Sequence, residues 1–467
     1  MKFFKSNKSN KSNKLNKSKS NENDNNLVIS KIITLGKSRD HRFHLRFLRD
    51  GRGILNIDAK HIIFLNETAR LYFYLFISGH SMRKIQRTFM NTFRGITKQQ
   101  VASDWKDIMK KITQIIEGEN LCPVHDIGLI PKPAYEDVGF PLRVDLAITY
   151  SCNNLCPHCY VPKDILNNFP DELDLDKMKC LMDKLWDLGV PHIALTGGEA
   201  TTRRDFIDLI EYGQNKGFVM GIITNGRLFS DEELVKTSIQ KGLDYVQITI
   251  ESHDAEIHDK MQGVKGAFKE TVQAIKNFMN KDIFVLTNTT ICRENLSDID
   301  KTIKFLYDLG IRAFAMNGLI YSGRGAELQK EKQNFLLESE LEGVIDKIYS
   351  YADSLDMRFI WYTPTQYCVF NPIEMGLGPK HCSAANMSIS IQPNGDVIPC
   401  QSYFQAVGNI LTDSWDEIWN SDLFKSIRKH DFVEEKCKKC ELLEICGGGC
   451  PLYIKEKSVI PSHMSHL

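Results

Sequence analysis

The chain has 467 residues, and its 59 basic and 59 acidic side chains give a formal net charge of zero, which provides no overall attraction to nucleic acid or to an anionic membrane. No apolar run approaches the ~18–20 residues of a membrane span, and no apolar segment follows the N-terminal lysines as in a signal peptide. We therefore expect a cytoplasmic protein with no membrane partner, built from about two to four domains.

Residues 1–26 form a tract of lysine, serine and asparagine, with seven lysines against Glu22 and Asp24. This tract has too few apolar residues to offset the entropy cost of ordering the chain. We expect a disordered tail that aids solubility. A weak role at an RNA or membrane surface is the alternative.

Residues 27–119 are expected to form a small winged-helix-like domain. Three segments have strand patterns, namely Val28–Leu35, His44–Leu48 and His61–Phe64. Three helices follow, and their first turns are marked by the capping residues Asn66, Ser81 and Thr97. DNA binding is one interpretation of this shape, but the third helix places Asp104 and Asp107 beside its lysines, where a DNA-reading helix has a basic stripe.

The segment FLNETARLYFYLFISGHSMRKIQRTF in this domain resembles the PqqD-like domain, the RiPP recognition element of enzymes that modify ribosomally made peptides. The resemblance implies that residues 27–119 bind the leader of a precursor peptide as an added strand. In such β-augmentation, backbone hydrogen bonds supply affinity and side-chain pockets supply specificity.

A linker rich in proline and glycine is expected over residues 120–139, where Cys122 and His125 look incidental. Residues 140–330 then alternate between strand and helix. The expected strands are Val144–Thr149, His192–Thr196, Val219–Thr224, Tyr245–Ile250, Ile283–Thr290 and Arg312–Asn317. The expected helices are Leu175–Leu188, Asp205–Asn215, Asp231–Lys241, Ala267–Asn280 and Asp298–Leu309. Six such units predict an α/β fold with a parallel sheet, and ligands bind at the carboxyl ends of such strands.

A cysteine loop with the spacing C-x3-C-x2-C, formed by Cys152, Cys156 and Cys159, follows the first of these strands. The chain has 13 cysteines and no export signal, so metal binding is a better interpretation than disulfides. Three thiolates can hold three irons of a [4Fe–4S] cluster and leave the fourth iron open. The alternative is a zinc site with His158 as the fourth ligand.

The cysteine loop and the Tyr160 that follows it resemble the signature of radical S-adenosylmethionine (SAM) enzymes. That resemblance implies a partial (β/α)6 TIM-like barrel, a [4Fe–4S] cluster whose open iron binds SAM, and an electron donor such as flavodoxin or ferredoxin. It also implies an anaerobic setting. The reduced cluster would cleave SAM, and the 5′-deoxyadenosyl radical would abstract hydrogen from the substrate.

Polar and glycine motifs at later strand ends also resemble the SAM-binding elements of this family. Gly197-Gly198-Glu199 resembles the motif that holds the methionyl amine, and Thr224-Asn225-Gly226 matches a second element. Glu251 stands where the family has Asp, and Gln262 stands where Arg is frequent, which puts the contact to the SAM carboxylate in doubt. The implied SAM-contacting residues are Gly197, Gly198, Glu199, Asn225, Thr249, Glu251 and Asn288.

Connecting helices are expected over residues 331–364, and a second cysteine-rich region over residues 365–467. Asn394-Gly395 predicts a hairpin turn between Ser388–Gln392 and Asp396–Pro399. Six cysteines at ligand-like spacing surround it, namely Cys382, Cys400, Cys437, Cys440, Cys446 and Cys450. A zinc ribbon is one interpretation of this set.

Beside a radical SAM core, this set resembles the SPASM domain, which carries auxiliary [4Fe–4S] clusters. The resemblance implies one cluster held by Cys382, Cys400 and Cys450, with Cys368 as our candidate for its fourth ligand. It implies a second cluster held by Cys437, Cys440 and Cys446. The family has one more cysteine after the last motif and this chain has none, so one or two clusters are expected, with His463 and His466 as weak candidate ligands.

These features together predict a radical SAM/SPASM peptide maturase that introduces a thioether or another oxidative crosslink into a precursor peptide. An enzyme acting on a small molecule or tetrapyrrole is the first alternative. An iron–sulfur, redox-sensing DNA-binding regulator is the second, and the SAM motifs argue against it. The catalytic base remains unassigned because no residue is marked by a motif.

Overall fold

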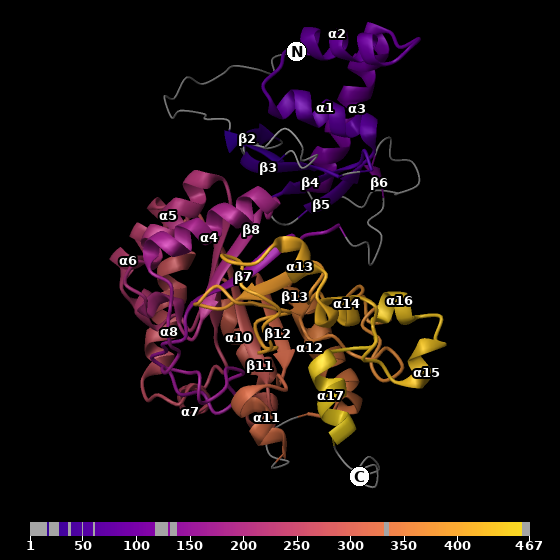
Figure 1. Cartoon of the computed structure of the whole chain (residues 1–467). Coiled ribbons are helices and arrows are strands. Elements are labelled where there is room, and N and C mark those ends of the chain that lie inside the picture. The colour runs from indigo at the N-terminus through magenta and orange to yellow at the C-terminus, as the bar shows by residue number, and fades with distance from the viewer. Residues whose placement is uncertain are drawn as a thin grey trace. The chain divides into compact units, whose positions relative to one another are not determined.

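The structure, a computed structural model, describes residues 16–17, 28–35, 39–48, 50–58, 61–116, 129–130, 138–330 and 336–459. The chain forms two compact units, Met1–Pro133 with Asp187–Pro191, and Ala134–Trp186 with His192–Leu467 (Figure 1). The expected tail over residues 1–26 and linker over 120–139 lie almost entirely outside the described residues, as do Cys122, His125, His463 and His466. Among the described helices, none is long and apolar enough to cross a membrane.

The first unit contains an antiparallel sheet with the strand order β1-β2-β3-β4-β5-β6. Its strands are β1 (Asn16–Lys17), β2 (Val28–Leu35), β3 (Arg39–Phe47), β4 (Gly53–Ile57), β5 (His61–Leu65) and β6 (Leu129–Ile130). Strand β4 was not expected from the sequence. All five of its residues are buried, so it lacks the alternation of apolar and polar residues that marks a half-exposed strand.

Three helices follow the sheet, α1 (Glu67–Ile77), α2 (Met82–Thr92) and α3 (Lys98–Ile116). The side chain of Asn66 caps α1 by accepting a hydrogen bond from the Ala69 N–H at 2.9 Å. Thr97 accepts from the Gln100 N–H at 3.1 Å, but the Gln100 side chain donates to Asp104, so only half of the expected capping box forms. Ser81 makes no side-chain capping hydrogen bond, but each helix begins directly after its predicted capping residue.

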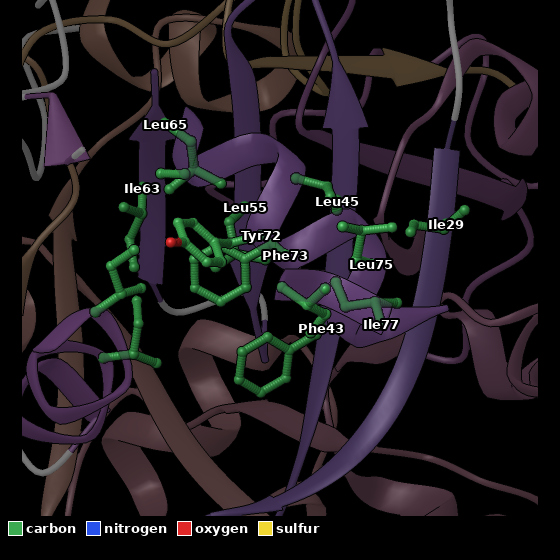
Figure 2. Close-up of a cluster of buried hydrophobic side chains, with 14 of the residues drawn as sticks. Ile29, Phe43, Leu45, Leu55, Ile63, Leu65, Tyr72, Phe73, Leu75 and Ile77 are labelled. Carbon is green, nitrogen blue, oxygen red and sulfur yellow. The ribbon is translucent and has the colours of Figure 1, made fainter. Parts of the chain in front are cut away.

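Apolar side chains from the strands and from α1 form the core of this unit (Figure 2). The strand residues Ile29, Phe43, Leu45 and Leu55 pack against α1. On the other side of α1, the ring of Tyr72 stacks on Phe89 of α2 with 3.9 Å between ring centroids. This core joins the sheet to the helices, as a domain of this size requires.

The second unit is built on a sheet with the order β13-β12-β11-β10-β9-β8-β7-β14-β15, in which β13 to β14 are parallel and β15 is antiparallel. The strands are β7 (Arg143–Thr149), β8 (His192–Gly197), β9 (Val219–Thr224), β10 (Tyr245–Thr249), β11 (Phe284–Ile291), β12 (Ala313–Gly318), β13 (Arg358–Trp361), β14 (Ser388–Ile391) and β15 (Val397–Ile398). The sequence predicted the first six within one or two residues at each end. The predicted α/β fold with a parallel sheet is confirmed.

Helices connect these strands. They are α4 (Leu175–Leu188), α5 (Phe206–Lys216), α6 (Glu232–Gln240), α7 (Ala255–Gln262), α8 (Ala267–Met279), α9 (Arg293–Leu296), α10 (Ile299–Asp308), α11 (Gly323–Lys330) and α12 (Glu338–Ser354). Helices α4, α5, α6, α8 and α10 lie where the sequence predicted helices, α12 lies in the expected connecting region, and α7, α9 and α11 were not predicted. Strand β13 extends the sheet within residues 331–364, where only helices were expected. It has only four residues, too few to give a clear strand pattern.

The C-terminal region begins with the predicted hairpin of β14 and β15, where Gly395 has a φ of +92° that favours glycine. Strand β14 pairs in parallel with β7, so this region is continuous with the main sheet. Short helices follow, namely α13 (Trp415–Trp419), α14 (Asp422–Arg428), α15 (Glu435–Lys438), α16 (Leu443–Cys446) and α17 (Pro451–Val459).

The core of the first unit yields a stability prediction. Phe73 is fully buried, so Phe73→Ala should destabilise this unit by about 3–5 kcal/mol, because the substitution removes apolar contacts and leaves a cavity. Hydrogen exchange measured by mass spectrometry should show faster exchange in β3–β5 and unchanged exchange in β7–β12. Met90→Ala, at an exposed position of α2, is the matched control and should change neither. Equal acceleration in both units would contradict the division of the chain into two units.

Candidate functional site

The predicted site residues lie along one edge of the parallel sheet in the second unit. The cysteine loop follows the end of β7, and Gly197 ends β8. Asn225 and Glu251 come just after the ends of β9 and β10, where Thr249 is the last strand residue. Because these neighbouring strands are parallel, their carboxyl ends meet at the same edge.

Backbone hydrogen bonds join the end of β8 to the start of the cysteine loop. The N–H of Gly198 donates to the Thr149 carbonyl at 2.9 Å, and the N–H of Glu199 donates to the Ser151 carbonyl at 2.8 Å. A Cβ at position 197 would lie 1.9 Å from the Thr149 oxygen, and one at position 198 would lie 2.6 Å from the Ser151 oxygen. The two glycines are therefore required by this close backbone contact, in addition to any approach of a ligand.

The carboxylate of Glu199 is 1% exposed and is surrounded by hydrogen-bond donors. It accepts from the N–H and hydroxyl of Thr201, from the Thr224 hydroxyl at 2.7 Å and from the Asn225 N–H at 2.7 Å. Burial raises the pKa of Glu199, and these hydrogen bonds oppose part of the rise. Glu199 thus ties β8 to β9 directly beside the cysteine loop.

The three thiols of the cysteine loop lie near one another. Burial raises the pKa of Cys152 to about 12, and the nearby charge of Glu199 adds to the increase. Burial also raises the pKa of Cys156 well above its ordinary value, with further contributions from Cys159 and Cys152. Crowded, buried thiols of this kind become thiolates when a metal supplies positive charge, which fits an iron–sulfur cluster.

Within the described ranges, no three His, Cys, Asp or Glu side chains converge on a point where they could hold a single metal ion. A cluster does not require such convergence, since each thiolate binds a different iron. Backbone contacts fix the loop in place instead. The N–H of Cys152 donates to Asn167 Oδ1 at 2.7 Å, and the N–H of Asn154 donates to Cys152 Sγ at 3.4 Å.

His158, within the cysteine loop, pairs with the buried Glu251 that follows β10. His158 Nε2 lies 3.1 Å from Glu251 Oε1, and Glu251 is completely buried. Its other oxygen accepts from the Thr290 N–H at 2.8 Å. Gln262 completes the group, because its Oε1 accepts from Asn154 Nδ2 at 2.5 Å. The structure thus places His158 in an anchoring contact to β10, and it places Glu251 against the loop itself.

Asn225 directly follows β9 and Thr249 ends β10, whereas Asn288 lies inside β11, opposite Thr249, and not at the end of the strand as the sequence predicted. Asn225 Nδ2 donates to Asn153 Oδ1 at 2.7 Å, so it touches the cysteine loop. Asn288 Nδ2 donates to Asn317 Oδ1 at 2.8 Å, while its own Oδ1 is buried and has no hydrogen-bond partner among the described residues. A buried acceptor without a donor is costly. A ligand with amine or hydroxyl donors, as SAM has, would satisfy it.

Sequence reasoning missed Arg324, which follows β12 at the same edge. Its guanidinium lowers the pKa values of both Cys152 and Cys156, which places the charge close to the loop. Its Nε is buried without a partner in the described part of the chain. The neighbouring Gly325 N–H donates to the Cys159 carbonyl at 3.3 Å. The signal available in the sequence was the Gly323-Arg324-Gly325 segment after the sixth predicted strand.

The C-terminal cysteines form two groups. Burial raises the pKa of Cys382, and the thiols of Cys450 and Cys400 add to the increase. In the other group, burial raises the pKa of Cys437, and the largest further contribution comes from Cys368. The structure therefore places Cys368 beside the Cys437 group.

Two protein-family models match the chain. The model of the radical SAM superfamily matches residues 146–306, and the model of the SPASM iron–sulfur cluster-binding domain matches residues 382–441. The chain is 30% identical over 351 residues to the antilisterial bacteriocin subtilosin biosynthesis protein AlbA of Bacillus subtilis, covering 72% of each protein. It is 27% identical to the PqqA peptide cyclase of Bradyrhizobium diazoefficiens, covering 68% of this chain and 82% of that protein.

Another relative is the AdoMet-dependent heme synthase of Nitratidesulfovibrio vulgaris, which is 28% identical over 64% of this chain and 85% of that protein. Among solved structures, Streptococcus suis SuiB bound to S-adenosylmethionine matches 91% of this chain and 97% of that chain, with a TM-score of 0.65 and 17% identity, a likeness of fold. Together with the cysteine loop and the glycine motif at one sheet edge, these matches show that the chain belongs to the radical SAM superfamily and is a radical SAM/SPASM enzyme, whose chemistry needs a [4Fe–4S] cluster, SAM and auxiliary iron–sulfur clusters.

Proposed function

We propose that this enzyme modifies a ribosomally made precursor peptide and binds the leader of that peptide through residues 27–119, a PqqD-like recognition domain. The proposal rests on the fold of the first unit, in which β2–β5 form an antiparallel sheet that is followed by α1–α3. The names of two relatives, a bacteriocin biosynthesis protein and a peptide cyclase, support a peptide substrate. SuiB has also been solved bound to its precursor peptide SuiA.

The edge of β5 is the proposed site of leader binding. Strand β6 already pairs with it in antiparallel fashion, opposite Phe64 and Leu65, so this edge accepts an added strand. A strand edge of this kind is a template for another chain, and a leader peptide would extend the sheet there.

Cys152, Cys156 and Cys159 are proposed to hold the SAM-cleaving cluster, with Gly197, Gly198 and Glu199 at the amine end of SAM. When bound, the cluster supplies the electron that breaks the sulfonium bond of SAM and so produces the 5′-deoxyadenosyl radical. Asn225, Thr249, Glu251 and Asn288 contribute polar groups around SAM, and Glu251 also fixes His158. Arg324 is proposed to bind the SAM carboxylate, since its charge lies beside the loop and its Nε lacks a partner in the described structure.

The remaining ligand cysteines are proposed to hold the auxiliary clusters, namely Cys368, Cys382, Cys400, Cys437, Cys440, Cys446 and Cys450. Such clusters can accept the electron that a substrate radical releases, which favours a net oxidation such as a thioether or another crosslink. Flavodoxin or ferredoxin is the proposed electron donor. In this proposal the recognition domain binds the peptide, the SAM core forms the radical, and the cluster domain accepts the electron in the oxidation.

A tetrapyrrole substrate is the second candidate, because a heme synthase is also a relative. The two candidates differ in what the first unit should bind. We expect a short peptide encoded beside this gene to slow hydrogen exchange in β5, since added backbone hydrogen bonds protect its amides. A scrambled peptide is the control. If the peptide leaves β5 unchanged while iron coproporphyrin protects the edge of β7–β11, the tetrapyrrole candidate is favoured.

The proposed cluster ligands give a second prediction. The triple variant Cys152→Ala, Cys156→Ala, Cys159→Ala should lose formation of 5′-deoxyadenosine, because no open iron remains to bind SAM. It should retain iron in its C-terminal region, measured after anaerobic reconstitution. Cys180→Ala, at an exposed position on α4, is the control and should keep full activity. Continued SAM cleavage by the triple variant would refute the assignment of the cysteine loop.

Arg324 gives a third prediction. Arg324→Gln should weaken SAM binding by roughly 10–100-fold, because a hydrogen bond to a charged group contributes about 1.5–3 kcal/mol. Equilibrium dialysis under anaerobic conditions measures the affinity, and iron analysis checks that the cluster content is unchanged. Lys304→Gln, a loss of charge at an exposed position of α10, should leave the affinity at the wild-type value. Unaltered SAM affinity in Arg324→Gln would exclude the carboxylate contact.

A further inference from the structure

We infer that Cys368 is the fourth thiolate of the auxiliary cluster held by Cys437, Cys440 and Cys446, and that the cluster held by Cys382, Cys400 and Cys450 keeps one iron to which the described part of the chain supplies no cysteine ligand. The inference rests on the auxiliary clusters of the proposed function and assigns their ligands. It reverses the arrangement expected from the sequence, in which Cys368 completed the Cys382 cluster. We call the two sets the outer set (Cys368, Cys437, Cys440, Cys446) and the inner set (Cys382, Cys400, Cys450).

Backbone contacts bring the segment that carries Cys368 against the outer set. The N–H of Tyr367, the residue before Cys368, donates to Cys446 Sγ at 3.4 Å. Cys446 Sγ in turn lies 3.8 Å from the Thr365 carbonyl. A Cβ at position 449 would lie 3.2 Å from Cγ of Gln366. Residues 365–367 therefore run along residues 446–449, and Cys368 follows directly.

Electrostatic contributions agree with these contacts. After burial, the charge of Cys368 is the largest contribution that raises the pKa of Cys437. Cys368 and Cys440 both contribute to the raised pKa of Cys446. The four thiols of the outer set are thus linked by proximity, Cys437 to Cys368 and Cys446, and Cys446 to Cys368 and Cys440, which fits a [4Fe–4S] cluster with four cysteine ligands.

The inner set contains three thiols. Cys450 and Cys400 are the thiols that raise the pKa of Cys382, and Cys450 also contributes to that of Cys400. The N–H of Ala385 donates to the Pro399 carbonyl at 3.1 Å and holds the two parts of this set together. Of the other described cysteines, Cys180 lies exposed on α4 and Cys292 lies buried at the end of β11, beside Glu251. Neither belongs to this set.

The position of the inner set gives its open iron a role. Tyr160 directly follows the cysteine loop, and its hydroxyl donates to Gln401 Oε1 at 3.3 Å, next to Cys400. The inner set is therefore linked to the SAM-cleaving loop, whereas Cys368 and Cys440 of the outer set are exposed. An open iron near the radical site can bind a thiolate, carboxylate or imidazole donor of the substrate. The outer cluster, fully held by cysteine, is placed to pass electrons onward.

The test compares single variants in the Cys152/Cys156/Cys159→Ala background, which removes the SAM-cleaving cluster and its own open iron. Electron paramagnetic resonance of the reduced protein, recorded against potential, resolves the two remaining clusters without SAM or peptide. Cys368→Ala and Cys440→Ala should shift or remove the same signal. Cys382→Ala should change the other signal. Cys180→Ala, the control, should change neither.

Cyanide serves as a probe of open iron in the same background. It should alter only the signal that Cys382→Ala alters, and it should alter both signals once Cys368→Ala has opened the outer cluster. If Cys368→Ala changes the signal that Cys382→Ala alters, or changes neither signal, the inference is wrong, while the proposal of auxiliary clusters is unaffected. If the Cys152/Cys156/Cys159→Ala protein holds no iron in its C-terminal region, the inference and the proposed auxiliary clusters are both wrong. The two outcomes therefore distinguish a failure of the inference from a failure of the proposed function.

Discussion

The site depends on one backbone contact, in which the end of β8 is held against the start of the cysteine loop. Gly198 and Glu199 donate their N–H groups to the carbonyls of Thr149 and Ser151, at a separation that leaves no room for a Cβ on either glycine. A side chain here would push the strand ends apart. The loop that carries Cys152 would then lose its fixed position relative to the SAM-binding edge.

Two buried carboxylates extend this contact across the sheet. Glu199 joins β8 to β9 through its bonds to Thr224 and Asn225, and Glu251 joins β10 to the cysteine loop through His158. Each accepts several hydrogen bonds, which offset part of the cost of burying its charge. The edge is thereby preorganised before any cofactor binds, which limits the reorganisation that SAM cleavage would require.

Much of the fold was predictable because its signals are local. The strands β7–β12 are short apolar runs, five of which end at Thr or Gly, and the helices between them carry amphipathic patterns and capping residues. Spacing along the chain marked the cysteines as candidate metal ligands, and the resemblance to known families supplied their expected grouping. The uniformly buried β4 and the four-residue β13 were missed because neither gives a periodic pattern.

Tertiary relationships could not be predicted in this way. His158 and Glu251 are 93 residues apart, and the contact that brings Cys368 to Cys446 joins residues 79 apart at Tyr367. Spacing along the chain does not determine which distant side chains meet, so it could not decide which set of cysteines Cys368 joins. The position of Arg324 beside the loop likewise depends on the folded sheet.

The central claim, that this radical SAM/SPASM enzyme oxidises a ribosomal peptide, is tested most directly by mass spectrometry of the product. The full-length protein, reconstituted with iron and sulfide, is incubated anaerobically with SAM, dithionite and the peptide encoded beside its gene. The account predicts a peptide lighter by the mass of two hydrogen atoms per modification, with 5′-deoxyadenosine formed in proportion. An unchanged peptide, with 5′-deoxyadenosine formed only when iron coproporphyrin is supplied and consumed, would contradict it.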